Sequence, residues 1–303
     1  MLISEKFQQT DFSTAEQNVV TYIQEHRETL ADATVKELAD ACFVHPSTLI
    51  RVAKKMGFEG WLDLKNAYLE EASYLDSHFT EIDPNIPFQP TDGLITIAKK
   101  IANLEQTTIA DTLELLKYDD LKQAKNYLLK ADFVKIFASN ANSLIPQDFA
   151  LKMNRIQQNV SVSTVLGEGF YEAYNCPPTS CGILISYTGE NTHILRTAKI
   201  LKERGIPVIA ITSIGENSLA AISDCTLRIT TRERLFSKIG NFTINTSICY
   251  LLDILYCAVF SEHYGENFDH LIEVGQIIDR RRTSSDIMRE PLLDTIQPDW
   301  LPN

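Results

Sequence analysis

The chain has 303 residues, 44% of them hydrophobic and 22% charged, which is the balance of a globular protein with a sizeable buried core. Its formal net charge of −12 excludes general affinity for nucleic acid over the whole surface, because a strongly acidic protein repels phosphate at long range. Any contact with DNA therefore has to come from a local cluster of cations.

Residues 13–72 carry apolar side chains at helical spacing and contain no convincing strand. Within them, residues 34–41 predict one short helix. A second helix is predicted to begin at Pro46 after a short turn, because proline suits the first helical position. The stretch 76–93 has three prolines and little periodicity, so we predict a linker there and a separate domain at 1–75.

The second of these helices has two chemically different sides. Residues 46–56 hold three cations and no carboxylate, whereas residues 1–75 as a whole hold seven Lys or Arg and twelve Asp or Glu. A stripe of hydroxyls and cations fits the major groove of DNA and its phosphates, although an ordinary amphipathic helix with a solvated polar side has the same pattern. Steps of 100° per residue place five polar side chains within an arc of about 120°, namely Ser47, Thr48, Arg51, Lys54 and Lys55, opposite Leu49, Ile50, Val52, Ala53 and Met56.

A second pattern follows the predicted linker. Helical periodicity at 94–116 and 119–130 gives way to short β-rich runs that alternate with helices, and a long apolar helix is predicted at about 240–262. Continuous apolar strands separated by helices are typical of a parallel sheet covered on both faces, so we predict a doubly wound α/β domain. The five predicted strands are "DFVKIF", "NVSVSTV", "CGILIS", "IPVIAIT" and "CTLRIT".

The stretch "ISYTGEN", residues 185–191, ends one of these strands and leads into a helix. Such a loop brings hydroxyl groups, backbone N–H groups and the positive end of a helix dipole to one point, which suits a phosphate. In a doubly wound sheet, ligands collect at strand ends of this kind. The competing interpretation is a plain turn in which Ser and Thr cap the helix.

The segment "STAEQNVVTYIQEHRETLADATVKELADACFVHPSTLIRVAKKMGFEGWLDLKNAYLEE" resembles the N-terminal helix-turn-helix domain of the RpiR family of bacterial transcriptional regulators. The resemblance rests on "VKELAD", "STLIR-AKK-GF" and "G-LDLK", and it implies a DNA-binding domain whose recognition helix follows Pro46. The family usually has Gly in the turn and Ser at the helix cap, where this chain has Phe43 and His45. We therefore expect Phe43 at a positive φ and a weaker cap from His45.

The segment from about 130 to 262 is similar to the sugar isomerase (SIS) domain, which follows the helix-turn-helix in that family and senses a phosphorylated sugar. The resemblance rests on "DFALKMNRI", the "SYTGE" loop, "ILRTAKILKERGIPVIAIT", "SLAAISDCTLRI" and the late "LLDILY". It implies a SIS domain at 94–282 with flanking helices and a C-terminal tail at 283–303. The fold expected for the whole chain is thus an all-helical domain followed by a five-stranded α/β domain.

The same resemblance implies a phosphate site with two walls. The wall after the third strand keeps the family pattern except at its last position, where Asn191 replaces Thr. The wall after the first strand, residues 138–142, lacks the two glycines and the serine of the family pattern, so amide or hydroxyl groups would have to replace them. The ligand-binding residues that we expect are Ser186, Thr188, Gly189, Glu190, Asn191, Asn142 and Ser139.

Together the two resemblances imply a cytoplasmic transcriptional regulator that binds double-stranded operator DNA as a homodimer or tetramer and responds to a sugar-phosphate effector. A sugar-phosphate isomerase is one alternative, with Glu190, His193 and Glu233 as candidate acids or bases. A SIS domain with a degenerate site that serves only dimerisation is another. We expect no enzyme activity, because a DNA-binding domain would have no purpose in an isomerase.

The cysteines form no C-x-x-C pair and no metal-ligand spacing with the six histidines, so we expect reduced thiols, no metal and no cofactor. The N-terminus lacks a signal-peptide pattern, and the apolar stretch "ICYLLDILYCAVF" contains Asp253 and is expected to be too short for a bilayer. The cations Arg280, Arg281 and Arg282 are expected at a solvated helix end. The six cysteines are Cys42, Cys176, Cys181, Cys225, Cys249 and Cys257.

Overall fold

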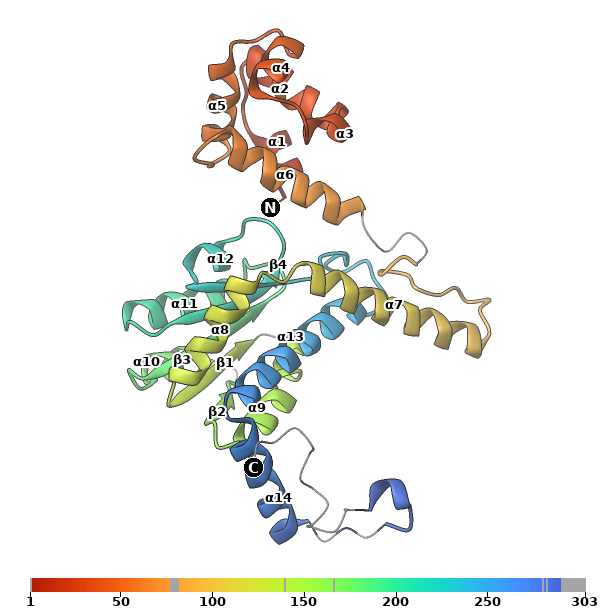
Figure 1. Ribbon diagram of the computed structural model, residues 1–303, viewed down its shortest axis with the longest axis vertical. Helices are drawn as coiled ribbons and strands as arrows, with labels where there is room; N and C mark the ends of the chain where they lie inside the picture. Colours follow the sequence, from red (N-terminus) through yellow and green to blue (C-terminus); the bar gives the residue numbers. More distant parts are fainter. Residues whose placement is uncertain are drawn as a thin grey trace.

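The computed structural model describes residues 2–76, 82–138, 140–165, 167–279, 281 and 283–289 of the chain. Figure 1 shows a helical N-terminal domain above a larger α/β domain, with the last long helix at the end farthest from the N-terminal domain. The helices of the N-terminal domain are α1 (Ile3–Gln9), α2 (Thr14–Glu25), α3 (Arg27–Leu30), α4 (Val35–Ala41), α5 (Pro46–Lys55) and α6 (Trp61–Asp76).

Helices α4 and α5 form the predicted helix-turn-helix pair. Thr34 caps α4, where its hydroxyl accepts from the backbone N–H of Glu37 at 3.3 Å, and the Glu37 carboxylate accepts from the Thr34 N–H in return. Pro46 opens α5, and the ring of His45 accepts from the N–H of Ser47 at 3.3 Å. One apolar core joins all six N-terminal helices, with Leu30 as the contribution of α3. Helix α1, which the periodicity did not predict, contributes Ile3 and Phe7 to this core.

The α/β domain is built on one parallel sheet with strand order β2-β1-β3-β4-β5. Its central strand β3 is buried along its whole length, which explains why that segment reads as a continuous apolar run instead of an alternating one. The strands are β1 (Phe133–Ala138), β2 (Val160–Val162), β3 (Ser180–Ser186), β4 (Val208–Ser213) and β5 (Cys225–Ile229).

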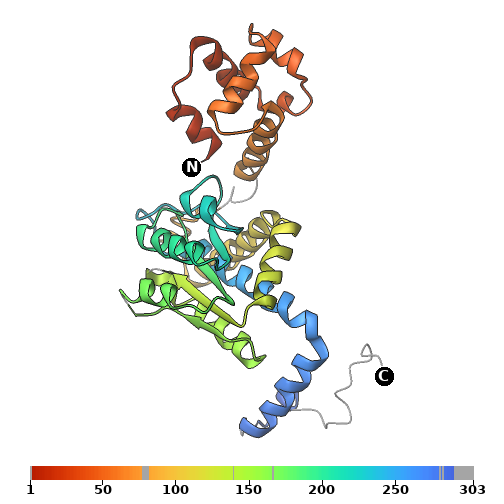
Figure 2. The same cartoon turned by 90° about the vertical axis from the view of Figure 1, so that its left-hand side faces the viewer.

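Helices cover both faces of the sheet, as Figure 2 shows. On one face, α8, α9 and α13 pack against the strands, and on the other face α10, α11 and α12 do so. Helix α7 lies outside the first layer and packs along α13. The helices are α7 (Leu94–Glu114), α8 (Tyr118–Lys130), α9 (Pro146–Arg155), α10 (Gly169–Tyr174), α11 (Thr192–Glu203), α12 (Ser218–Ile222), α13 (Phe242–Phe260) and α14 (Tyr264–Ile278), with 3-10 turns at Asn140–Ser143, Ser261–His263 and Asp286–Met288.

The predicted fold class is confirmed: a helical N-terminal region precedes a five-stranded parallel sheet with helices on both faces. Part of the predicted linker, residues 77–81, lies outside the described residues, and so does most of the predicted tail. Arg280 and Arg282 also lie outside them, while Arg281 pairs with Asp279 just after α14 ends. The predicted domain limits therefore stay predictions.

The sequence-based expectation for the long apolar segment needs a correction. The helical run continues from α13 through α14, so residues Phe242–Ile278 reach the length and mean hydropathy, 1.5, of a helix that could cross a membrane. The first half of this run, α13, is a core helix because Ile248, Leu251 and Leu255 are fully buried against the sheet. A single helix of this kind is weak evidence for a membrane segment.

Candidate functional site

Helix α5 presents most of the predicted polar stripe to solvent. Ser47, Arg51, Lys54 and Lys55 are exposed, and the apolar side packs into the helical core. Thr48 is different: it is buried, and its hydroxyl accepts a 3.0 Å hydrogen bond from the guanidinium of Arg51. It is therefore placed to orient Arg51. The assignment of Ile50 to the buried side is wrong, because 47% of its surface is exposed beside the polar stripe.

A carboxylate from another helix restrains the cations at the end of α5. Glu16 of α2 is 4% exposed, and its carboxylate accepts from the Lys55 ammonium at 2.7 Å and lies 4.0 Å from the Arg51 guanidinium. The hydrogen bond from Lys55 and those from Ser13 lower the pKa of Glu16 to about 2. Lys55 is thus held against the domain, whereas Arg51 and Lys54 extend from an exposed surface.

The turn before α5 is strained in the way the sequence predicts. Phe43 has φ 55°, in the left-handed region that favours glycine, and its side chain is 94% exposed. The next residue, Val44, packs against the helical core. Phe43 consequently gains no burial that would offset its strained backbone, and its ring projects into solvent at the start of the exposed surface of α5.

The two predicted phosphate walls follow the carboxyl ends of the neighbouring strands β1 and β3. Strand β1 pairs with β3 so that Ala138 is opposite Ile185, and each chain segment then leaves the sheet at its carboxyl end. The strand order reverses between β1 and β3, and ligands of doubly wound sheets bind at this switch point. Asn142 belongs to the 3-10 turn after β1, while Ser139 lies outside the described residues.

The loop after β3 is fixed by its packing on α12. Gly189 has φ 68°, and a Cβ at this position would lie 2.1 Å from Oδ1 of Asn217, so both backbone and space require glycine. The carboxylate of Glu190 accepts from the N–H of Ser218 at 2.8 Å, which lowers the pKa of Glu190. These two predicted ligand residues therefore hold the loop in its conformation through contacts within the protein.

The remaining loop residues have two different roles: Asn191 caps a helix, and Ser186 and Thr188 carry the loop's hydroxyl groups. Asn191 caps α11: its carbonyl oxygen accepts from the N–H groups of His193 at 3.0 Å and Ile194 at 3.1 Å. Thr188 is exposed, with its hydroxyl accepting from the Glu190 N–H at 3.2 Å, and Ser186 is buried at the end of β3. Of the two loop hydroxyls, that of Thr188 thus belongs to an exposed residue and that of Ser186 to a buried one.

Tyr187 is a residue of this loop that the sequence reasoning did not select. Burial raises the pKa of Tyr187, and its protonated hydroxyl donates a 2.7 Å hydrogen bond to the backbone carbonyl of Glu233. The Lys238 ammonium lies 5.7 Å from the centre of the Tyr187 ring. An aromatic residue between Ser186 and Thr188 was the only available signal, and it does not identify a partner 46 residues away.

Both oxygens of the Glu233 carboxylate accept hydrogen bonds from other groups of the protein. Its side chain is 0% exposed, and it accepts from Lys238 Nζ at 2.8 Å and from the Thr243 N–H at 2.6 Å and hydroxyl at 2.8 Å, at the start of α13. His193 stacks on Phe170 at 4.2 Å. Within the described ranges, no group of three or more His, Cys, Asp or Glu side chains could hold a metal ion, and all six cysteines are free.

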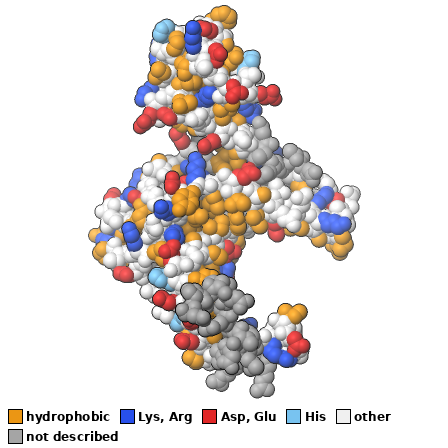
Figure 3. All heavy atoms as spheres, in the orientation of Figure 1, with side chains coloured by type: hydrophobic (Ala, Val, Ile, Leu, Met, Phe, Trp, Pro, Cys, Tyr) orange, Lys and Arg blue, Asp and Glu red, His pale blue; other side chains and the backbone are white. Residues whose placement is uncertain are grey.

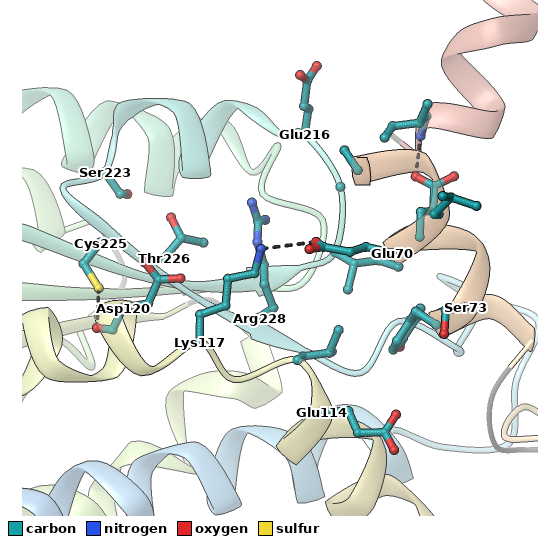
Figure 4. A pocket seen from close by; sticks show the side chains of 18 of the residues that line it. Glu70, Ser73, Glu114, Lys117, Asp120, Glu216, Ser223, Cys225, Thr226 and Arg228 are labelled. Carbon is teal, nitrogen blue, oxygen red and sulfur yellow. Dashed lines mark hydrogen bonds and ion pairs between the residues drawn. The ribbon is translucent and has the colours of Figure 1, made fainter. Parts of the chain in front are cut away.

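A cleft of about 930 Å³ separates the helical domain from the α/β domain. Figure 4 shows side chains of α6, such as Glu70, on one wall, and Arg228 of β5 and Asp120 of α8 on the other. The Lys117 ammonium crosses the cleft to Glu70 at 3.3 Å. Both partners are about two thirds exposed, so this ion pair adds little stability.

Two family models match the chain in succession. The model described as "Helix-turn-helix domain, rpiR family" matches residues 1–74, and the model described as "SIS domain" matches residues 127–258. The first region contains the helices of the helical domain as far as residue 74, and the second runs from within α8 to within α13 and contains all five strands of the sheet. Their order along the chain is the order that the sequence predicts.

Relatives and solved structures share this architecture. An uncharacterized HTH-type transcriptional regulator of Caldanaerobacter subterraneus subsp. tengcongensis is 24% identical over 276 residues, which cover 91% of this chain and 96% of that protein. YbbH of Bacillus subtilis, another uncharacterized HTH-type transcriptional regulator, is 24% identical over 250 residues, which cover 82% and 87%. The structure of the Vibrio vulnificus NanR protein complexed with ManNAc-6P covers 88% of this chain and 93% of its own, with 21% identity and a TM-score of 0.56, a similarity of fold.

Proposed function

Because this chain belongs to the RpiR family of helix-turn-helix transcriptional regulators with a SIS domain, we propose that it binds operator DNA through α5 and that a phosphorylated sugar modulates this binding. The observation that carries the proposal is the exposed cationic stripe of α5 in an otherwise acidic protein. The stripe gives local attraction to phosphate, and Ser47 and Arg51 have donors suited to base edges.

The ligand is proposed to lie at the switch point between β1 and β3. The Thr188 hydroxyl, the strand-end Ser186 and the amide of Asn142 come from both sides of this point, and α11 directs the positive end of its dipole toward the loop. A sugar phosphate is favoured as the ligand class because NanR, a structural relative, was solved with ManNAc-6P. Gly189, Glu190 and Asn191 are proposed to shape the loop, since Gly189 allows its close packing on Asn217 and the side chains of Glu190 and Asn191 accept hydrogen bonds from backbone N–H groups.

A role as an isomerase is disfavoured by the state of Glu233, one of the three candidate acids or bases. An aldose-ketose isomerase needs a carboxylate or imidazole free to take a proton from the substrate. Glu233 instead caps α13 and pairs with Lys238, with no exposed side-chain surface. We therefore propose a sensor without catalytic activity.

The assembly is proposed to be a homodimer in the cytoplasm, where a DNA-binding protein meets its operator. Two reading heads related by a two-fold axis would address half-sites about one helical turn, ~34 Å, or a multiple of it apart. Figure 3 shows hydrophobic side chains gathered over the middle of the molecule, where α7, α8 and α13 lie. Leu113 at the end of α7 is 54% exposed and Tyr118 at the start of α8 is 75% exposed, which suits contact with a second copy.

Two measurements test this function together. Thermal unfolding against a panel of sugar phosphates that includes ManNAc-6P should reveal a ligand by an increase in Tm that grows with ligand concentration. The same ligand should then change the affinity for a promoter fragment measured by fluorescence anisotropy. Turnover of a sugar phosphate in the absence of DNA, or no binding to DNA at low salt, would contradict the proposal.

A further inference from the structure

The end of α6 is the place where the helical domain is attached to the α/β domain. Helix α6 contributes Leu64 and Tyr68 to the helical core and then continues for two more turns to the other domain. There the N–H of Thr231 donates to the hydroxyl of Tyr74 at 2.8 Å, and the guanidinium of Arg232 donates to the carbonyls of Tyr74 and Leu75. Arg232 thus caps the carboxyl end of α6 and opposes its dipole.

A buried carboxylate anchors this contact within the α/β domain. Asp111 of α7 has no exposed surface, and it pairs with Arg232 at 3.1 Å and accepts from the Thr230 hydroxyl at 2.8 Å. The Tyr74 hydroxyl also bonds to this carboxylate, and burial together with the charge of Asp111 raises the pKa of Tyr74. The Arg232 guanidinium lies 4.3 Å from the centre of the Tyr74 ring. Helix α6, helix α7 and the segment after β5 therefore meet around the buried carboxylate of Asp111.

The same short segment reaches the proposed ligand loop at its other side. The residue after Arg232 is Glu233, whose carbonyl accepts the hydroxyl of Tyr187. Tyr187 lies between Ser186 and Thr188, the residues proposed to face the ligand. Arg232, whose side chain binds the end of α6, and Glu233, whose carbonyl binds Tyr187 of the loop, are therefore adjacent residues.

A second connection runs beside the first. Lys6 of α1 pairs with Glu216 at 2.7 Å and donates to the carbonyl of Met56, the residue directly after α5, at 2.6 Å. Glu216 precedes Asn217, which packs directly against Gly189 of the ligand loop. The carboxyl end of the recognition helix and the ligand loop are thus joined through Lys6 and the loop after β4.

Beside these contacts lies the cleft of about 930 Å³ shown in Figure 4, which the exposed ion pair between Lys117 and Glu70 crosses. Among the described residues, each apolar cluster stays within one domain, and the contacts between the domains that are named above are polar. Polar contacts of this kind have discrete alternatives in water, so a reorientation costs little compared with the opening of an apolar interface. The contacts at 230–233 are accordingly suited to a switch.

We propose that residues 230–233 are a coupling segment that transmits the state of the ligand loop to the DNA-reading helices, with Tyr187 and Arg232 as its positioning residues. This inference rests on the proposed function for its ligand and its DNA. A ligand at Ser186 and Thr188 shifts Tyr187, Tyr187 shifts the Glu233 carbonyl, and Arg232 changes its hold on the end of α6. Because α6 is one helix from the core of the reading head to this contact, the head turns with it.

The test uses Tyr187→Phe and Tyr74→Phe in the full chain. Each change removes one hydroxyl and keeps the ring, so Asp111 and Arg232 stay paired and folding is preserved. Tyr171→Phe, a tyrosine of α10 that is 68% exposed, is the matched control. With the panel member that stabilises the wild type, Tyr187→Phe should keep ligand and DNA affinity within about twofold, while the ligand-induced change in DNA affinity, 5- to 150-fold for a typical coupling, falls below about twofold. A response equal to that of the wild type overturns the coupling segment and leaves the proposed function intact.

If no sugar phosphate of the panel binds, the proposed function fails. A measurement without ligand then still tests the coupling segment. Hydrogen exchange of the backbone N–H groups in residues 72–76, at the end of α6, reports the hold of Arg232 from the other domain. Tyr187→Phe should raise their exchange about fivefold, although Tyr187 does not belong to the helical domain, while the control leaves them unchanged. Tyr74→Phe removes a contact of α6 directly and should raise the same exchange, which shows that the probe responds. Exchange within twofold of the wild type in Tyr187→Phe refutes the coupling.

Discussion

The ammonium of Lys55 donates a 2.7 Å hydrogen bond to the carboxylate of Glu16, which joins the end of the recognition helix to α2 across 39 residues of sequence. The same carboxylate lies 4.0 Å from Arg51. A single buried acid therefore orients two of the cations on the surface proposed to bind DNA. It also distinguishes Lys55, which is held, from Lys54, which extends into solvent.

Arg51→Ala should weaken operator binding by about 1–3 kcal/mol, roughly 5- to 150-fold, because the exposed guanidinium can make a bidentate contact with a base edge. The measurement is fluorescence anisotropy at fixed salt, with circular dichroism and sedimentation to show that fold and assembly are kept. Arg155→Ala, an exposed arginine of α9, serves as the control. An operator affinity equal to that of the wild type would exclude Arg51 from the DNA contact.

The stability of the helical domain should depend on the charge of Glu16. Its pKa is about 2 in the folded protein against an ordinary value of 4.5, so its contribution is complete above about pH 4.5 and is lost as the pH falls toward 2. Thermal unfolding of the wild type and of Glu16→Gln between pH 6 and pH 3 measures this. The two Tm values should differ at pH 6 and converge on acidification. A difference that stays constant with pH would show that the ionised carboxylate is not what stabilises the domain.

Ser186→Ala combined with Thr188→Ala should abolish the response to a sugar phosphate and leave operator affinity in the absence of ligand unchanged. The two hydroxyls are the loop groups proposed to donate to the phosphate, and both belong to the α/β domain, whereas α5 belongs to the helical domain. The checks are the Tm increase with ligand and the anisotropy with and without it, with Thr91→Ala, an exposed threonine before α7, as the control. A double variant that still responds fully would place the ligand elsewhere.

Gly189→Ala should destabilise the α/β domain by about 2 kcal/mol or more. Alanine would have to keep the positive φ of 68°, which an L side chain disfavours. Its Cβ would also overlap Oδ1 of Asn217, at a distance of 2.1 Å. Gly205→Ala is a matched control, since Gly205 has φ 72° but nothing within 4 Å of the added Cβ, so it bears the backbone cost alone. Denaturant unfolding that gives equal losses for both variants would contradict the tight packing of the loop on α12.

Local sequence patterns predict the elements of this protein well because their signals are local. The apolar run at 181–186 is a strand buried on both faces, and Pro46 opens α5 as expected. Phe43 takes the positive φ that the family's glycine suggests. Helix α1 was missed because a seven-residue helix that buries only Ile3 and Phe7 is too short for a clear periodicity.

Local patterns serve the candidate site less well. Thr48 and Ile50 exchange the sides expected of them, because the packing of α5 on α2 and α6 differs from an ideal helical wheel. Glu233 looks like a catalytic acid in the sequence and is the buried cap of α13 in the structure. The role of Tyr187 depends on a partner 46 residues away.

The sequence by itself determined the two domains' fold classes, the cationic character of α5 and the position of the loop after β3, since each follows from periodicity, charge or a motif within a few residues. Only the tertiary structure decided which polar groups are open to a partner. Hydrogen-bond partners such as Lys55 and Glu16, or Arg232 and Asp111, come from distant segments that the fold brings together. The energy of a buried polar group depends on those partners, and no local pattern records them.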